Sequence, residues 1–214
     1  MSKFRLVTAM ALALGALVLP SVAHATLAPA EWTSNGSTIN SNQTITSTTT
    51  AASTSNTGRI LTTASNGVTI ACHLTINAGN SWVGDAGTDF FDSADVAYSD
   101  CVSNLCAGVT ATNGGNIGSQ LSYDTTTGTI VDVLTGFSFT THVPCVGSIT
   151  FAGSVETMAT HDPAACGGNG GVILEFMNSA TGGTVTGPGG LTARWSGFQE
   201  VCLDDGSDLD VEIP

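Results

Sequence analysis

The sequence predicts an all-β protein, an antiparallel β-sandwich or flattened barrel that is held together by disulfides. Short runs alternate apolar and polar residues with a period of two, the pattern of strands that bury one face. Glycine-rich turn signals such as Asn66-Gly67 and Gly187-Pro188-Gly189-Gly190 separate these runs. All six cysteines follow a segment with the pattern of an export signal, and an even number of cysteines in an exported chain predicts three disulfides.

Residues 1–25 have the three parts of a secretory signal peptide. Lys3 and Arg5 form a positive start, residues 6–22 are apolar, and Ala23-His24-Ala25 supplies a small-x-small cleavage pattern. The alternative is a retained membrane anchor, but the apolar run is short for a span. We expect cleavage after Ala25 and a secreted protein, extracellular or at the cell surface, with the periplasm as the other destination.

Charged residues make up only 10% of the chain. Without the predicted signal peptide, Arg59 and Arg194 are the only strong bases and face 17 carboxylates. Nucleic acids and anionic membrane surfaces bind clusters of Lys and Arg, so neither is expected as a partner. No later stretch is long and apolar enough for a transmembrane helix, so no membrane span is expected in the mature protein.

Residues 26–64 form a first predicted segment that is rich in Ser, Thr and Asn, which occupy 19 of the 26 positions from 33 to 58. One interpretation is a set of polar edge strands, because Thr favours the β region and Ile39 and Ile45 are spaced for pairing. The other is a flexible tail. We favour edge strands, and we expect a chain truncated to residue 60 to keep a folded body.

Residues 65–214 are predicted to form the β-sandwich domain, with an acidic C-terminal tail. In the first strand, one face carries Val68, Ile70, Cys72, Leu74 and Ile76, so Cys72 is expected to point into the core. Residues 88–98 are interpreted as a strand entered from a turn. The core-facing positions of the later runs are Val131, Val133, Phe137, Phe139, Val143 and Cys145; Ile149, Phe151 and Val155; Val172, Leu174 and Phe176; and Leu191, Ala193 and Trp195.

The cysteines allow fifteen disulfide connectivities, and spacing singles out one pair only. Cys101 and Cys106 are close enough in sequence to close a small loop. A zinc site is the alternative use of these thiols, but the chain has no C-x-x-C pair and its histidines lie far from the cysteines. The six cysteines expected in disulfides are Cys72, Cys101, Cys106, Cys145, Cys166 and Cys202.

No catalytic motif is present. Nucleophilic catalysis requires a base within hydrogen-bond reach of the nucleophile, and the chain has no G-x-S-x-G elbow. Three histidines follow the predicted signal peptide, His73, His142 and His161. Asp162 after His161 precedes a proline, and we interpret it as the start of a turn. No catalytic residue is therefore predicted.

Two groups of carboxylates are interpreted as solvated acidic loops. Calcium binding is the alternative for the C-terminal group, where Asp204, Asp205, Asp208 and Asp210 surround a glycine, because hard cations take several closely spaced oxygens. The spacing does not match the D-x-[DN]-x-[DN]-G calcium loop. Calcium is a weaker alternative for the other group, and no other cofactor is expected. That group consists of Asp85, Asp89, Asp92, Asp95 and Asp100.

Three cysteine-containing strands, Val68–Ile76, Ala94–Cys101 and Pro144–Phe151, precede a final strand that ends near Cys202. In this order, and in its richness in small residues, the chain resembles the exported proteins called protein activator of alkane oxidation. The resemblance covers roughly residues 65 to 203, and the Thr-rich start and acidic end depart from it. It implies an exported, disulfide-stapled, non-enzymatic β-protein of Gram-negative bacteria, linked to growth on hydrophobic substrates or to the cell surface. It transfers no functional residues.

These observations lead to one main expectation about function. We expect a non-enzymatic secreted or cell-surface β-protein that acts by binding or assembly, through self-association or as a surface component, linked to biofilm or to the use of hydrophobic substrates. An exported hydrolase is one alternative, and it requires His142 or His161 to meet a carboxylate and a serine in a cleft. A pilin-like or fibre-like subunit is the other.

Overall fold

The computed structural model describes residues 27–50, 58–176 and 185–214. The predicted signal peptide lies outside the described residues, as do positions 51–57 of the polar N-terminal segment. The described chain forms antiparallel strands and three single-turn 3-10 helices, and it contains no α-helix. The all-β prediction is confirmed. Within the described ranges, no helix is long and apolar enough to cross a membrane.

The strands are β1 (Leu27–Pro29), β2 (Glu31–Ser34), β3 (Ser37–Thr38), β4 (Gln43–Thr50), β5 (Ile60–Ala64), β6 (Thr69–Ile76), β7 (Trp82–Val83), β8 (Thr88–Phe91), β9 (Val96–Ser103), β10 (Thr110–Asn113), β11 (Ile117–Asp124), β12 (Thr129–Val143), β13 (Gly147–Asp162), β14 (Gly171–Phe176), β15 (Val185–Thr186), β16 (Thr192–Leu203) and β17 (Leu209–Glu212). The 3-10 turns are η1 (Asp85–Gly87), η2 (Cys166–Gly168) and η3 (Pro188–Gly190). The segment interpreted as one strand, residues 88–98, contains β8, a turn and the start of β9.

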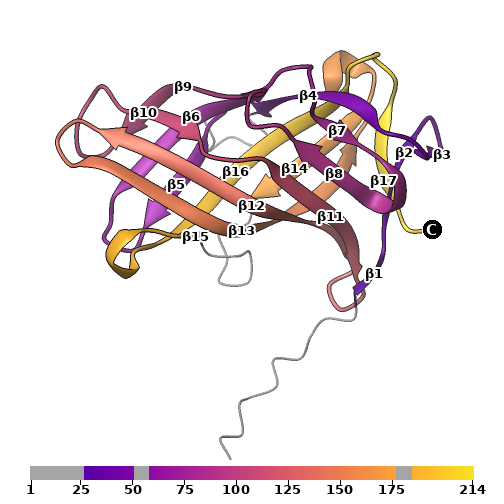
Figure 1. Ribbon diagram of the computed structural model, residues 1–214. Coiled ribbons are helices and arrows are strands. Elements are labelled where there is room, and N and C mark those ends of the chain that lie inside the picture. The colour runs from indigo at the N-terminus through magenta and orange to yellow at the C-terminus, as the bar shows by residue number, and fades with distance from the viewer. Residues whose placement is uncertain (1–26, 51–57, 177–184) are drawn as a thin grey trace, which may run out of the picture.

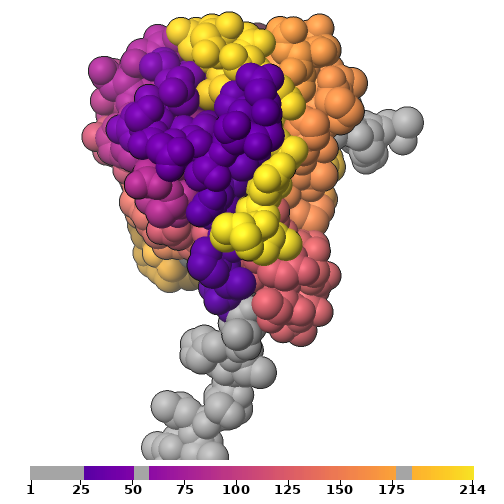
Figure 2. Space-filling view, turned by 90° about the vertical axis from the view of Figure 1, so that its right-hand side faces the viewer, coloured from indigo at the N-terminus to yellow at the C-terminus, as the bar shows by residue number. Residues whose placement is uncertain are grey.

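Strand pairing closes the large sheet on itself. Hydrogen-bonded neighbours run from β4 through β7, β8, β11, β12, β13, β14 and β16 back to β4, which gives the flattened barrel. Strands β5, β6 and β9 continue from β16 on one side, and β10 continues from β12 on the other. Figure 1 shows β9 and β10 at one end of the molecule and β1 and the C-terminus at the opposite end. A small sheet, β17-β2-β3, lies at this second end, which faces the viewer in Figure 2.

The three longest strands each contain a glycine with positive φ. Gly136 in β12, Gly153 in β13 and Gly197 in β16 have φ of 73°, 155° and 145°. At the first of them a bulge shifts the register between Leu134 and Phe137. Near these glycines β12 changes its partner from β11 to β10, and β16 changes from β5 to β4.

The bends divide the molecule into two lobes. We call the half with β5, β9, β10 and β15 the β5 lobe, and the half with β1–β4, β7, β8, β11, β14 and β17 the β8 lobe. The long strands β12, β13 and β16 run through both lobes. Each lobe therefore has its own set of short strands on a shared long-strand framework.

The core largely follows the predicted alternation, with one correction in β12. Val131 and Val133, expected to face the core, are only half-buried, whereas Asp132 and Leu134 are buried. The extra residue at the Gly136 bulge reverses the inward face, because side chains alternate along a strand. Cys145, also expected to face inward, is exposed, and Leu191 is half-buried. The other predicted core positions of these runs are buried, and an aromatic cluster of Trp195 with Phe137, Phe139 and Phe176 lies at the junction of the lobes.

The polar N-terminal segment is an integral part of the sheet, which corrects the expectation of edge strands. Strand β4 pairs with β16, β6 and β7, so it is an interior strand. Its inward side chains are Ile45, Ser47 and Thr49. The hydroxyls are tolerated inside because Ser47 donates to the Glu200 carbonyl at 2.6 Å and Thr49 accepts from the Leu74 amide at 3.3 Å. The division at residue 64 is not structural, because β5 and β6 pair across it.

Three disulfides are present, and no cysteine is free among the described residues. They join Cys72 to Cys101, Cys106 to Cys145, and Cys166 to Cys202. The small loop that the spacing of Cys101 and Cys106 would allow does not form. Cys101 instead bonds to the buried Cys72 on the neighbouring strand, at a register shift where Asp100 takes a φ of 49°.

A chain that lacks residues up to Thr50 should not fold, because the deletion removes buried Trp32 and Ile45 and leaves the edges of β16, β7 and β17 without partners. Circular dichroism melting of the truncated chain measures this. A control that ends its deletion at Pro29 removes only β1, which pairs with β11 alone, and should melt cooperatively. Cooperative melting of the longer deletion at the wild-type temperature would restore the detachable-strand interpretation.

The substitution Gly197→Ala should destabilise the fold by about 3 kcal/mol, in the range of strong backbone strain and overlap. A Cβ at this position would lie 2.9 Å from the Arg59 carbonyl oxygen, and φ of 145° strains any other residue. Gly189→Ala is the matched control, because Gly189 also has positive φ but has open space around its Cβ. Chemical denaturation compares the two, and equal losses would show that the close approach at Gly197 is unimportant.

Candidate functional site

The two histidines considered as a catalytic base, exposed His142 and half-buried His161, each lack part of a catalytic triad. His142 lies opposite Ser148 on neighbouring strands, and its Nδ1 is 3.2 Å from the serine Oγ. Both side chains are exposed on the outer surface. Within the described part of the chain, no hydrogen bond or ion pair joins His142 to a carboxylate. This pair therefore lacks the group that orients and stabilises the imidazole of a hydrolase.

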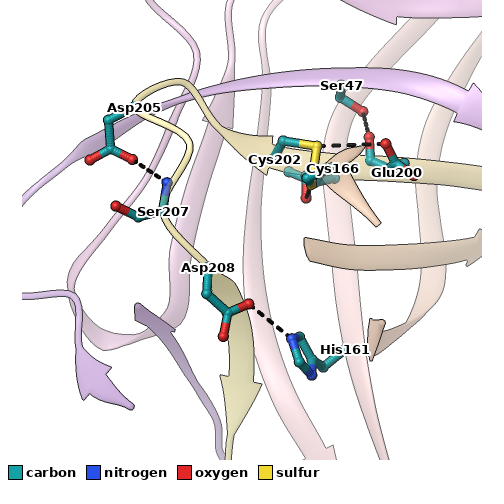
Figure 3. Close-up of a disulfide and its surroundings, with 9 residues drawn as sticks. Ser47, His161, Cys166, Glu200, Cys202, Asp205, Ser207 and Asp208 are labelled. Atoms are coloured by element: carbon teal, nitrogen blue, oxygen red, sulfur yellow. Dashed lines mark hydrogen bonds and ion pairs between the residues drawn. A yellow bond between two sulfur atoms is a disulfide. The ribbon is translucent and has the colours of Figure 1, made fainter. Parts of the chain in front are cut away.

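His161 has the opposite combination, with carboxylates but no serine. Its Nε2 lies 3.0 Å from Asp208 Oδ1, and its Nδ1 lies 3.8 Å from Asp210 Oδ2. Figure 3 shows the imidazole directed at Asp208. The contacts link β13 to β17, so this histidine ties the C-terminal strand to the body. Asp162 is not part of the pair, because its Oδ1 accepts the Ala164 amide at 2.9 Å and begins a turn as predicted.

The four carboxylates considered for calcium do not converge on one point. Asp205 accepts the Ser207 amide at 2.9 Å, Asp208 and Asp210 contact His161, and Asp210 also accepts the amide of its neighbour Val211. Asp204 is exposed. These side chains stabilise turns and the β17 strand, as Figure 3 shows for Asp205 and Asp208.

One group of metal-ligand residue types does come together in the described chain, formed by Cys166, Glu200 and Cys202. Its two sulfurs are joined in a disulfide, so neither is a thiolate. Glu200 Oε1 lies 3.7 Å from Cys202 Sγ (Figure 3). The arrangement is a disulfide beside a carboxylate and offers one ionised ligand.

The acidic cluster of residues 85–100 is not one solvated loop. Asp95 accepts the Asn80 and Ser81 amides at 2.8 and 2.9 Å and so orders the loop before β7. Asp89, by contrast, points inward from β8 and is only 3% exposed. The interpretation of Asp89 as a solvated carboxylate is therefore wrong.

Asp89 belongs to a buried acidic pair that the sequence analysis missed. It interacts with Asp132, which is fully buried, across strand β11. Ser119 lies between them, opposite Asp89 in the ladder, and donates its hydroxyl to Asp132 Oδ1. The remaining three carboxylate oxygens accept no hydrogen bond from another group. The sequence feature that could have predicted this pair is Thr135-Gly136. A bulge at these residues reverses which side chains of β12 face the core, and so directs Asp132 inward.

Burial favours the protonated form of the acidic pair. Burial, followed by the nearby charge of Asp132, raises the pKa of Asp89 well above its usual range. Burial also raises the pKa of Asp132 to about 6, against the lowering effect of hydrogen bonds from Ser119 and Asp89. Two carboxyl groups buried near each other cannot both ionise at low energy, so the raised pKa values favour protonation of the pair. Because both are buried, neither reaches a substrate.

Neither Asp89 nor Asp132 lines any of three cavities observed among residues 27–50, 58–176 and 185–214. The described residues enclose a separate cavity of about 20 Å³ between the sheets, large enough for one water molecule. Its lining is apolar except for Tyr98 and Gln199, whose buried Oη and Nε2 have no hydrogen-bond partner. An open groove of about 360 Å³ runs along β4 and the end of β6 beside Glu200 and Cys202.

The clearest surface feature is a set of exposed apolar side chains on the β5 lobe. Leu61, Val102, Leu105 and Val146 are 37%, 49%, 47% and 51% exposed. Leu61 and Val102 flank Ala71 across three neighbouring strands, so the three side chains form a row on the outer face. Leu105 and Val146 each adjoin a cysteine of the Cys106–Cys145 disulfide, which holds their two loops together.

Comparison with protein-family models, with curated proteins and with solved structures finds no match for this chain. The resemblance to the alkane oxidation activator family stays a prediction from the sequence. The surface and the interior described above are therefore the basis for assigning a function.

Stability should fall as the pH rises from about 4 to about 7, partly because of Asp132. Because the pKa of Asp132 is higher in the folded protein than in the unfolded chain, the folded protein binds the proton more tightly. The stabilisation from this proton is complete at pH values below the unfolded-state pKa, and it is lost as the pH rises through the folded-state pKa. The substitution Asp132→Asn should reduce this decline in the free energy of unfolding. Urea denaturation at several pH values measures it. Asp205→Asn, which removes an exposed charge, should keep the wild-type profile. Equal slopes in all three proteins would rule out this role of the pair.

Proposed function

We propose that this protein is an exported, non-enzymatic β-protein that acts outside the cell or at its surface by binding or assembly. The observation that carries the proposal is the exposed apolar set on the β5 lobe, Leu61, Val102, Leu105 and Val146. Large apolar side chains grouped on a surface mark sites of interaction. Three disulfides in the described chain support an oxidising destination.

The apolar set is preorganised for contact. Strand pairing fixes Leu61 and Val102, and the Cys106–Cys145 bond connects the loops of Leu105 and Val146. A surface that is already ordered loses less conformational entropy when it binds. The same four residues suit either a protein partner or a hydrophobic substrate, as the family resemblance implies.

The arrangement of polar groups argues for binding rather than catalysis. His142 has a serine neighbour and His161 has carboxylate neighbours, and they lie on different parts of β12 and β13. The acidic pair with raised pKa values is enclosed in the core. In the described chain, no observed cluster combines a nucleophile, a base and an orienting group, which is the arrangement that a hydrolase needs.

The protein should be recovered outside the cytoplasm, cleaved after Ala25, and should hydrolyse no ester, glycoside or peptide substrate. Cell fractionation, intact mass and a substrate screen test these three points. The variants His142→Ala and His161→Ala accompany the wild type in the screen. A wild-type activity that either substitution abolishes would replace the proposal with an exported hydrolase, and retention of the uncleaved chain in the cytoplasm would exclude a surface role.

A further inference from the structure

Charge is distributed very unequally between the two lobes. The chain contains 17 Asp and Glu residues, and Asp100 is the only one on the short strands of the β5 lobe. Twelve lie on strands of the β8 lobe or in the loops next to them. The other four lie on the long strands, on the β8-lobe side of their glycine bends: Asp132, Glu156, Asp162 and Glu200. Arg59 and Arg194, the two arginines of the described chain, both belong to the β5 lobe. Positions 51–57 and 177–184 contain no charged residue, so they do not alter this distribution.

The arginines lie beside the exposed apolar set. Arg194 is exposed on β16 next to Thr63 of β5, and Leu61 lies two positions along β5 on the same outer face. Arg59 lies two positions before Leu61 and donates its Nε to the Asp100 carbonyl at 3.1 Å. Alternation along β5 places Leu61 and Thr63, the ladder partner of Arg194, on one face, and Arg59 directly precedes this strand. We call this surface the head, formed by Arg59, Leu61, Val102, Leu105, Val146 and Arg194.

The opposite end of the molecule carries apolar and acidic side chains together. Leu27 and Ile213 are 53% and 51% exposed there. Leu27 pairs with Asp124 in the β1–β11 ladder, and Glu31 lies directly opposite Glu212 in the β2–β17 ladder. We call this surface the tail, formed by Leu27, Glu31, Asp124, Glu212 and Ile213. Figure 2 views this end, with the indigo N-terminal and yellow C-terminal segments side by side.

The Glu31–Glu212 pair is unfavourable within one molecule. Residues opposite each other on neighbouring strands project to the same face, and like charges in that position destabilise the sheet. Glu31 accepts a hydrogen bond from the Thr38 hydroxyl at 3.0 Å, whereas no basic side chain is observed to pair with either glutamate among the described residues. An arginine brought by another molecule relieves this repulsion.

From this geometry we propose that the head of one copy docks on the tail of the next copy, so that the protein assembles head to tail. The proposal rests on the proposed function and names the partner as a second copy of this chain. Apolar side chains at both ends meet, and the arginines of the head face the carboxylates of the tail. Docking two heads would bring arginines together, and docking two tails would bring carboxylates together, so only the head-to-tail contact joins unlike charges.

A head-to-tail contact uses two different surfaces, so each added copy presents a new head or tail. Such a heterologous contact builds a ring if its rotation closes and a filament if it does not. Strands β5 and β9, which carry Leu61 and Val102 of the head, lie toward one end of the molecule in Figure 1, and β1 and β17 of the tail lie toward the other, which favours an open filament. The attraction between exposed charges falls as salt increases, so assembly should be strongest at low ionic strength.

Sedimentation velocity tests this with three variants of the purified protein. The head variant carries Val102→Asp with Arg194→Glu, the tail variant carries Glu212→Lys with Ile213→Ser, and Ser154→Asp adds one charge at an exposed position between the lobes. Wild type and Ser154→Asp should form species larger than dimers that dissociate at high salt. The head and tail variants should each be monomeric, and their equimolar mixture should form dimers, because one intact head meets one intact tail.

Several results would overturn the head-to-tail contact. These are a wild type that stays monomeric at every concentration in low salt, a head or tail variant that still oligomerises alone, and a mixture that forms no dimers. Binding of monomers to hexadecane droplets through the head would assign the surface to a hydrophobic substrate instead. If a double variant does not melt at the wild-type temperature, a single substitution takes its place in the test. This is Leu105→Asp for the head and Leu27→Asp for the tail. A protein that is exported, inactive as a hydrolase and monomeric overturns this contact alone, whereas hydrolysis overturns the proposed function.

Discussion

The architecture depends on the bends in its three longest strands. A strand of twelve to sixteen residues is too long to stay flat against one small core, and here β12, β13 and β16 each turn at a glycine with positive φ. At Gly197 the approach of the Arg59 carbonyl leaves no room for a Cβ, so the bend also requires the smallest residue. Because the bends occur in neighbouring strands, one sheet serves two lobes with different short strands.

The bends also explain the polar interior. The bulge at Gly136 reverses β12 and directs Asp132 inward, where it meets Asp89 and the Ser119 hydroxyl. Burial of two ionised carboxylates is unfavourable, and the raised pKa values of both groups reduce this cost by favouring protonation. Hydroxyls on β4 are buried at lower cost because each is hydrogen-bonded to backbone. These polar groups give the β8 lobe an interior that is stabilised by hydrogen bonds as well as by apolar packing.

The two lobes also differ in the chemistry of their surfaces. The β5 lobe carries two of the three disulfides, both arginines and most of the exposed large apolar side chains. The β8 lobe carries nearly all the carboxylates and the histidine that secures the C-terminal strand. A molecule with unlike ends is suited to directional contacts, and the cross-linked loops of the β5 lobe present their side chains in a fixed arrangement. The two histidines with potential catalytic partners lie apart on this framework, each with an incomplete set.

The sequence by itself determined the fold class, most of the core and the presence of three disulfides, because alternation with a period of two and an even cysteine count are local properties. Cys72, Phe139 and Val172 are buried as their patterns predict. Tertiary structure decided what depends on long-range pairing. Cys101 bonds to Cys72, 29 residues earlier, rather than to nearby Cys106. Strand β4 is interior although its composition is that of an exposed segment. Asp132 faces the core, where it meets Asp89, because one bulged residue in β12 reverses the inward face of that strand. The head and tail surfaces likewise combine residues far apart in the chain, so strand order in space, which no local pattern encodes, places their charges together.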